Sequence, residues 1–431
     1  MPDRSIAFSV KQEIQDRKAL LFPDGWKLEM NDRRRSYVLE YYHLLGYDPS
    51  SLHDEQLTLV FHLLSRFEEY ATHIKHNGHN WEVDYATPVR IRQATVPVLE
   101  NLFDEWRGKG YLTEIEPKQP RWPDGKRFAL CLTHDMDHVC GNVLPDRIRS
   151  LPAYLEAPLV QKLIILLSTA RAVYWKVTGR SLPDPLLKEW LIEEEKQGFT
   201  SSMFFLPQPL PYPHWEDSFY RYTDKVRFGA TKIKITDAMQ EISNSGWDIG
   251  LHGSSRSYSD PELLSRERQI ISNACGREAV TIRQHHLLCD VRYTPWCQER
   301  AGLLADSTFG SNIRTSFRCG TGMPYFLYDF YQDRSLDLLE APLVIQDVAL
   351  FKVLQMDHDI ALYHCTAIME EVARHGGAMT ILWHNNYQAS DQEFGVYREL
   401  LEQAANMGAW GCSLRDLSNW WRLRRKNVQT L

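Results

Sequence analysis

The chain has 431 residues, of which 43% are hydrophobic and 24% charged, a balance that excludes disordered and fibrous proteins. Its 49 Lys and Arg residues against 56 Asp and Glu residues give a net charge of −7, which argues against a protein that coats nucleic acid. The length is that of two domains, or of one large α/β barrel with an extension.

The N-terminal part is predicted to form a domain of its own. The first residues mix both signs of charge and lack the apolar stretch of a signal peptide, which predicts a cytoplasmic protein. Residues 54–72 are predicted to be helical, and residues 114–127 hold three prolines and a glycine, as linkers do. We therefore expect a smaller mixed α/β domain over residues 1–122 and a second domain over residues 123–431. The apolar stripe of the predicted helix consists of Leu57, Val60, Phe61 and Leu64.

One apolar segment after the linker has two interpretations. Residues 163–170 form a run of eight between Lys162 and Arg171, which is too short to span a bilayer. A buried helix is the favoured interpretation. The alternative is a helix that contacts a membrane surface, because Tyr174 and Trp175 follow among basic residues.

From residue 128 onward, short apolar strands alternate with helical segments. This alternation is typical of parallel β/α architecture, and it predicts a distorted (β/α) barrel of about seven strands. Helices are expected at residues 185–197 and 235–246, and another is expected to begin at Asp260 and Pro261 with a cap residue and a proline in the first turn. The expected strands are 128–135, 201–206, 247–252, 279–287, 303–308, 378–386 and 409–414.

Polar residues gather at the ends of these strands. In a β/α barrel the carboxyl ends of the strands form the active-site face, so ionisable residues that recur there indicate an enzyme. A single histidine at a strand end is more often structural, but four strand ends show the pattern together. The residues are Asp135, Asp137, His252, Arg283, His285, His286 and His384.

Two carboxylates two residues apart, combined with several imidazoles, form a ligand set suited to Zn²⁺ and to metal-assisted hydrolysis. The sequence has no GxSxG elbow, P-loop or GxGxxG loop, which weakens serine-esterase and nucleotide-binding interpretations.

Two alternatives stay open. One is a metal-independent glycoside hydrolase, which needs two carboxyl groups about the glycosidic bond. The other is a glycan-binding or scaffold protein with a degenerate barrel.

Five motifs, in order, resemble those of the polysaccharide deacetylases of the NodB-homology, carbohydrate esterase 4 type. They are LTHDMDH (132–138), DIGLHGSS (248–255), IRQHHL (282–287), GLLADSTFG (302–310) and TILWHNN (380–386). The resemblance covers about residues 128–421. The first 120 residues look like an uncharacterised domain that precedes such deacetylases in some bacterial proteins.

The resemblance implies a role for each matching position. Asp135 would be the general base, His384 the general acid and Arg283 the residue that orients the base. Asp137 and His252 would be metal ligands. The acetyl pocket would be lined by Leu382 and Trp383.

The sequence departs from the family's motifs at two places. Met136 separates aspartates that are adjacent in the family, so the roles of Asp135 and Asp137 could be exchanged. Position 256 is Arg where the family has a second histidine. His285 is the expected third metal ligand, with substrate hydrogen bonding as the alternative. His286 is assigned to substrate binding, and with His134 and His138 it is a weaker candidate ligand.

Together these patterns predict a hydrolase that acts on C–N bonds other than peptide bonds and depends on a divalent metal, Zn²⁺ by preference. Its expected reaction removes an N-acetyl group from an amino sugar in a polysaccharide or glycan precursor. The expected partner is a carbohydrate. Nucleic acid and a transmembrane segment are not expected, and peripheral membrane contact is the remaining possibility.

Overall fold

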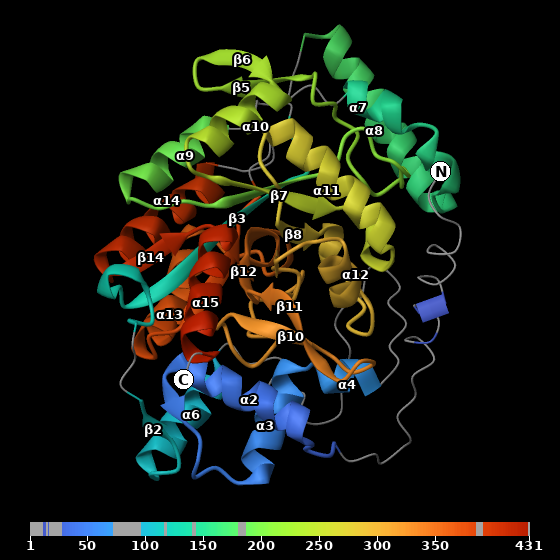
Figure 1. The fold of residues 1–431 in the computed structure, drawn as a ribbon. Coiled ribbons are helices and arrows are strands. Elements are labelled where there is room, and N and C mark those ends of the chain that lie inside the picture. The colour runs from blue at the N-terminus through green and yellow to red at the C-terminus, as the bar shows by residue number, and fades with distance from the viewer. Residues whose placement is uncertain are drawn as a thin grey trace.

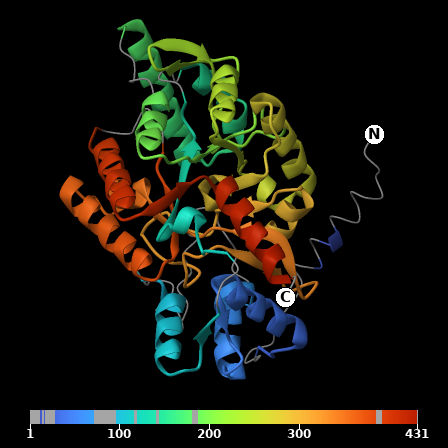
Figure 2. The same cartoon turned by 60° about the vertical axis from the view of Figure 1, so that its left-hand side comes forward.

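A computed structural model describes residues 28–71, 96–115, 119–139, 144–179, 187–384 and 391–429, together with residues 12, 13 and 16. A curled sheet surrounded by helices forms the larger part of the molecule, and the N-terminal helices lie together at one end of it (Figures 1 and 2). Asn385 and Asn386, the end of the last motif, fall outside the described residues.

The central sheet has ten strands in the order β10-β11-β9-β8-β7-β4-β3-β13-β12, and β14 also pairs with β3. All neighbours pair in parallel except β10 and β11. The strands are β3 (Phe128–Met136), β4 (Ser202–Phe205), β7 (Asp248–Gly253), β8 (Thr281–Gln284), β9 (Ala305–Asp306), β10 (Tyr325–Asp329), β11 (Arg334–Glu340), β12 (Leu343–Gln346), β13 (Ala378–Leu382) and β14 (Ala409–Cys412).

The distorted barrel expected from the sequence is confirmed, with more strands than the seven predicted. Each predicted strand is present, although most are shorter than expected. The three additional strands, β10 to β12, follow one another without intervening helices, so the alternation that revealed the others is missing there.

Helices and short helical turns connect and cover the strands. In α11, Asp260 accepts hydrogen bonds from the backbone N–H groups of Glu262 and Leu263, and Pro261 stands in the first turn, as the sequence predicts. The helices are α9 (Leu187–Lys196), α10 (Ile235–Asn244), α11 (Pro261–Cys275), α12 (Thr294–Arg300), α13 (His358–Arg374), α14 (Asp391–Asn406) and α15 (Leu414–Gln429). The turns are η1 (Pro123–Gly125), η3 (Ser257–Ser259), η4 (His285–Leu287) and η5 (Val348–Val353). A separate antiparallel hairpin consists of β5 (Lys225–Phe228) and β6 (Thr231–Lys234).

The N-terminal part is small and mixed, as expected. It contains α2 (Asp32–Leu45), β1 (Tyr47–Asp48), α3 (Asp54–Leu64), α4 (Phe67–Ala71), α6 (Val98–Gly108) and β2 (Thr113–Glu114). The single helix predicted over residues 54–72 is wrong: it is divided into α3 and α4 at Arg66, whose φ is 56°, and its last residue lies outside the described part.

The predicted apolar stripe of α3 is buried, and it packs on the barrel. The Phe61 ring makes edge contacts with Tyr328 and Phe330, at centroid distances of 4.9 and 5.6 Å. Next to it, Glu69 forms buried ion pairs with Arg66 and with Arg318 of the barrel. The two parts therefore share one apolar core and a buried charge cluster. The domain boundary at residue 122 stays a prediction.

An insertion between β3 and α9 consists of α7 (Leu144–Ser150), η2 (Ala153–Glu156) and α8 (Leu159–Val177). The expectation that α8 is buried is wrong. Only Ile165 and Ala172 of this helix are buried, and Ile165 packs with Tyr154 and Ala157 of the same insertion. Within the described residues, no helix is long and apolar enough to cross a membrane.

The contact of Phe61 with the β10–β11 hairpin predicts a stability effect. Phe61→Ala removes a fully buried ring, and we expect the free energy of unfolding to fall by about 3–5 kcal/mol. Urea unfolding followed by fluorescence measures this change. The control is Tyr363→Ala on α13, where the side chain is 77% exposed and a change within about 0.5 kcal/mol is expected. Equal effects of the two variants would contradict the shared core.

Candidate active site

The carboxyl ends of four strands bring the predicted site residues together. Asp135 lies in β3 and Asp137 directly follows it, His252 lies in β7, and Arg283 lies in β8. Together with β4 these strands follow one another in the sheet in the order β8-β7-β4-β3, so their ends meet at one edge of the sheet. His285 begins the turn after β8, and His384 follows β13.

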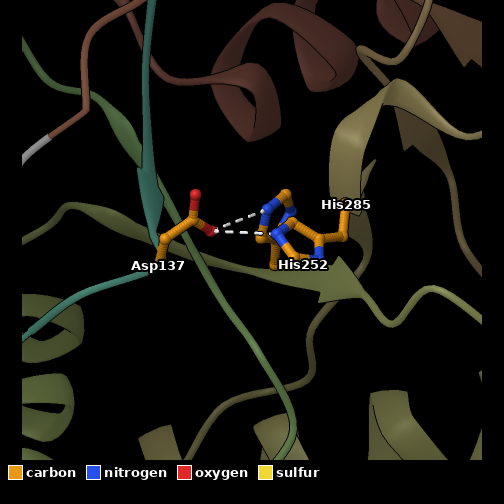
Figure 3. A group of neighbouring side chains, drawn as sticks. All are labelled: Asp137, His252 and His285. Carbon is orange, nitrogen blue, oxygen red and sulfur yellow. Dashed lines mark ion pairs between the residues drawn. The ribbon is translucent and has the colours of Figure 1, made fainter. Parts of the chain in front are cut away.

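Asp137, His252 and His285 form the centre of this group. One ligand atom from each lies within 4.8 Å of the other two, and the three side chains point toward one another (Figure 3). The Asp137 Oδ1 atom is 3.2 Å from His252 Nε2 and 3.7 Å from His285 Nε2. A carboxylate with two imidazoles is a donor set typical of Zn²⁺ sites.

The hydrogen bonds of the two imidazoles fix which nitrogen faces Asp137. His252 Nδ1 lies 2.8 Å from the carbonyl oxygen of Arg283, and a carbonyl can only accept, so Nδ1 carries the proton. His285 Nδ1 donates in the same way to Asp217 Oδ1, at 3.1 Å. Both rings therefore turn their Nε2 atoms toward the centre, which is how metal-binding histidines are oriented.

Two of the facing atoms are buried without a partner. Within the part of the chain that the structure describes, Asp137 Oδ1 and His252 Nε2 make no hydrogen bond. Burial by itself raises the pKa of Asp137, but the imidazoles of His285 and His252 outweigh it and hold the pKa well below its usual range. One carboxylate oxygen and two imidazole nitrogens that converge in a buried space form a donor set that a cation would stabilise, so these residues fit a divalent metal.

The position that differs from the family motif points away from this centre. Arg256 is 42% exposed and pairs with Glu156 of η2. The same loop nevertheless supports His285, because the backbone N–H and hydroxyl of Ser255 donate to Asp217 at 2.9 and 2.8 Å. His285 is thereby held where a third ligand is needed.

Asp135 lies on one side of the cluster and is held by Arg283. The Arg283 Nη1 atom is 3.1 Å from Asp135 Oδ1 and 2.7 Å from the Thr133 hydroxyl. The remaining donors of this buried guanidinium bond Ser307, Nε to its carbonyl and Nη2 to its hydroxyl, both at 2.8 Å. The second carboxylate oxygen of Asp135 lies 3.8 Å from His252 Nε2. Arg283 thus fixes a carboxylate beside the candidate metal position.

On another side of the cluster, His384 forms a pair with Asp347. His384 Nδ1 is 2.7 Å from Asp347 Oδ1, and the His384 backbone N–H donates to Oδ2 at 2.8 Å. Burial lowers the pKa of His384, but the carboxylates of Asp347 and Asp137 outweigh it and raise the pKa to about 10. His384 is therefore protonated at neutral pH, with Nε2 3.8 Å from Asp137 Oδ2.

The expected substrate-binding residues have three different environments. Leu382, at the end of β13, packs in a small apolar cluster with Leu287 of η4 and Leu343, the first residue of β12. Trp383 is fully buried, and its indole N–H donates to the Glu393 carbonyl. His286 is exposed and stacks on His285 at a centroid distance of 3.9 Å. The role of each in substrate binding stays a prediction.

The weaker candidate ligands lie outside the cluster. His134 is buried, and its two nitrogens contact the Trp383 carbonyl at 2.7 Å and Glu194 at 2.8 Å, so neither is free to bind a metal. His138 lies nearby, in a cleft lined also by Tyr154 and Asp217.

Sequence reasoning missed the two carboxylates that orient the histidines. Asp347 directly follows β12, and a prediction of that strand would have placed it at the site edge with the others. Asp217 lies in the connection between β4 and β5, where no periodic pattern marks it.

No family model and no curated protein sequence matches the chain. Similar solved structures include a proposed polysaccharide deacetylase of Mycobacterium smegmatis, with 17% identity, 72% of this chain and 96% of that chain covered, and a TM-score of 0.48. A proposed polysaccharide deacetylase of Pseudomonas aeruginosa PAO1 is 13% identical, with 71% and 95% covered and a TM-score of 0.48. An allantoinase is 13% identical, with 72% and 94% covered and a TM-score of 0.47. Polysaccharide deacetylases are thus among the structures to which this chain is similar, as its motifs suggest.

The geometry of the cluster predicts how zinc retention depends on each residue. Asp137→Ala, His252→Ala and His285→Ala each remove one donor and should leave little bound zinc after dialysis. Asp217→Asn should weaken zinc affinity by about 10–100-fold, because it loosens the ring of His285. Metal analysis of the purified variants measures these effects. His286→Ala is the matched control and should keep zinc, so zinc retained in His285→Ala would contradict this ligand set.

Proposed function

We propose that this protein is a metal-dependent hydrolase that removes an N-acetyl group from an amino sugar in a polysaccharide or glycan precursor. One observation carries the proposal: a candidate metal cluster lies between a carboxylate fixed by an arginine and a histidine kept protonated by a second carboxylate. The described site thus combines a ligand set, a base and an acid, which acyl hydrolysis needs within reach of one carbonyl.

Asp137, His252 and His285 would hold the divalent metal, and the carboxylate and imidazole donors favour Zn²⁺. Such an ion polarises an acyl carbonyl and lowers the pKa of water beside it. The hydrogen bonds behind the two rings support this assignment. The Arg283 carbonyl accepts from His252 Nδ1, and Asp217 accepts from His285 Nδ1.

The two residues beside the cluster would move protons. Asp135, held by Arg283, would accept a proton from the attacking water. His384 would donate its Nε2 proton to the sugar nitrogen as the C–N bond breaks, so that a neutral amine leaves together with acetate. Without a proton the nitrogen would have to leave as a strongly basic anion, so it leaves only when it is protonated, and the raised pKa of His384 suits that task.

The surroundings of the site suit an acetylated sugar. The apolar cluster of Leu287, Leu343 and Leu382 offers a place for the acetyl methyl group, with Trp383 packed in the core behind it. His286 lies on the exposed side, where it could donate to or accept from a sugar hydroxyl.

Acetate release from N-acetylglucosamine oligomers tests the function. With zinc bound, Asp135→Asn and His384→Ala should each lower kcat by about 10²–10⁴-fold, the usual contribution of an acid or base, while zinc content stays unchanged. His358→Ala, which changes a surface histidine paired with Glu399, is the control and should keep full activity. No acetate release by the zinc-loaded protein would overturn the proposal. Normal turnover in Asp135→Asn would move the base role to Asp137.

The Asp347–His384 pair predicts a pH effect. A general acid works below its own pKa, so the pKa of His384 places the loss of activity at the alkaline end of the profile. Asp347→Asn removes the carboxylate charge that raises this pKa, and the falling limb of kcat should move to lower pH. A pH series of acetate release on both proteins measures the shift. An unmoved falling limb would show that another group is the acid.

A further inference from the structure

Helix α8 directs an apolar face away from the protein. Figure 1 shows α7 and α8 at the outer edge of the molecule, at the end away from α2 and α6. Leu159 is 76% exposed, Leu167 72% and Val177 79%. At this exposure, burial of these apolar side chains contributes almost nothing to the stability of the fold. The other large exposed apolar residues of α8 are Val160, Leu163, Ile164, Leu166, Val173 and Tyr174.

In a normal surface helix the wider apolar face packs on the protein, whereas in α8 that face is exposed. Leu159, Leu163 and Leu166 follow one another at spacings of four and three, so they share one face, which Tyr174 and Val177 continue. Ile165 and Ala172, the buried pair, are seven residues apart and lie on the opposite side. The wider apolar face therefore points to the surroundings of the protein and the narrower one to its body.

Lys162 and Arg171 flank this exposed face, and Lys176 lies in the last turn of the helix. Residues 157–178 contain Lys162, Arg171 and Lys176 and no carboxylate, although the whole chain is acidic. The guanidinium of Arg171 lies over the Trp175 ring, 4.9 Å from its centroid. Apolar residues bordered by lysine, arginine and amphipathic aromatic rings are typical of helices that lie in the interface of an anionic membrane.

The segment that precedes α8 lines a cleft together with residues at the candidate active site. Arg147 of α7 donates to the Tyr154 hydroxyl of η2, and both line the cleft that His138 and Asp217 share. Asp217 is the residue that orients His285. A surface bound by α8 would thus lie against the same insertion that lines this cleft.

We propose that the exposed face of α8 docks on an anionic lipid bilayer. Its apolar side chains would enter the boundary between headgroups and acyl chains, and Lys162, Arg171 and Lys176 would pair with lipid phosphates. A second copy of the chain is the less suitable occupant, because a twofold contact would bring these basic flanks together. The proposal does not depend on the proposed hydrolase activity.

Vesicle flotation of the full-length protein tests the docking. The protein should float with phosphatidylcholine vesicles that contain phosphatidylglycerol, bind pure phosphatidylcholine far less, and lose binding as salt is raised. The double variant Leu163→Ser and Leu167→Ser should lower the partition coefficient at least about tenfold, because several buried methylene equivalents are lost. The triple variant Lys162→Gln, Arg171→Gln and Lys176→Gln should lower it only on the anionic vesicles.

Ile360→Ser is the matched control, since Ile360 on α13 is 54% exposed and Leu163 56%. It should float like the unchanged protein. Failure of the unchanged protein to float with anionic vesicles would overturn the proposal, and so would equal flotation of the double serine variant. Analytical ultracentrifugation adds a further test: a dimer that the double serine variant abolishes, in a protein that does not float, would assign the face to a second copy.

Discussion

The close approach of the Asp137 carboxylate to the Nε2 atoms of His252 and His285 is the constraint on which the rest of the site depends. Both rings are turned so that Nε2 faces an ionised oxygen, and Asp137 Oδ1 and His252 Nε2 are buried. Such an arrangement is costly without a positive charge at its centre. The residues around it, the Arg283 carbonyl and Asp217, hold the rings in this orientation and leave them little freedom to turn away.

The two residues proposed to transfer protons are each held by a partner of opposite charge. Arg283 bonds Asp135, and Asp347 bonds His384, so the proposed base and the proposed acid are both held in place beside one centre. Groups of opposite charge thus lie next to one another around the centre. Removal of one member should therefore change the behaviour of its neighbours as well as its own function.

Much of this arrangement can be predicted from the sequence, because it lies at the ends of strands. Asp135, His252, Arg283 and His384 each follow or end an apolar run, and parallel strands bring such ends to one edge. Arg256 already directed attention to His285 as a third ligand, and the structure places His285 in the cluster. Asp217 could not be found, since it lies in a connection without periodicity and approaches His285 only through the fold.

The errors in the prediction also have physical causes. The run at residues 163–170 has the composition of a core helix, and composition cannot tell whether an apolar face meets protein or another apolar phase. The break at Arg66 depends on a buried ion pair with Glu69 and on Arg318, which is 252 residues away in the chain. The local sequence pattern indicates neither what the apolar face of α8 contacts nor that the helix breaks at Arg66.

X-ray absorption spectroscopy of the zinc-loaded protein tests the central claim most directly. The account predicts one zinc ion coordinated by nitrogen and oxygen donors, with the multiple-scattering signature of two imidazoles. That signature should fall to one imidazole in any zinc that His285→Ala retains. Sulfur ligation, the absence of a specific zinc ion, or an unchanged two-imidazole spectrum in His285→Ala would contradict the Asp137, His252 and His285 site.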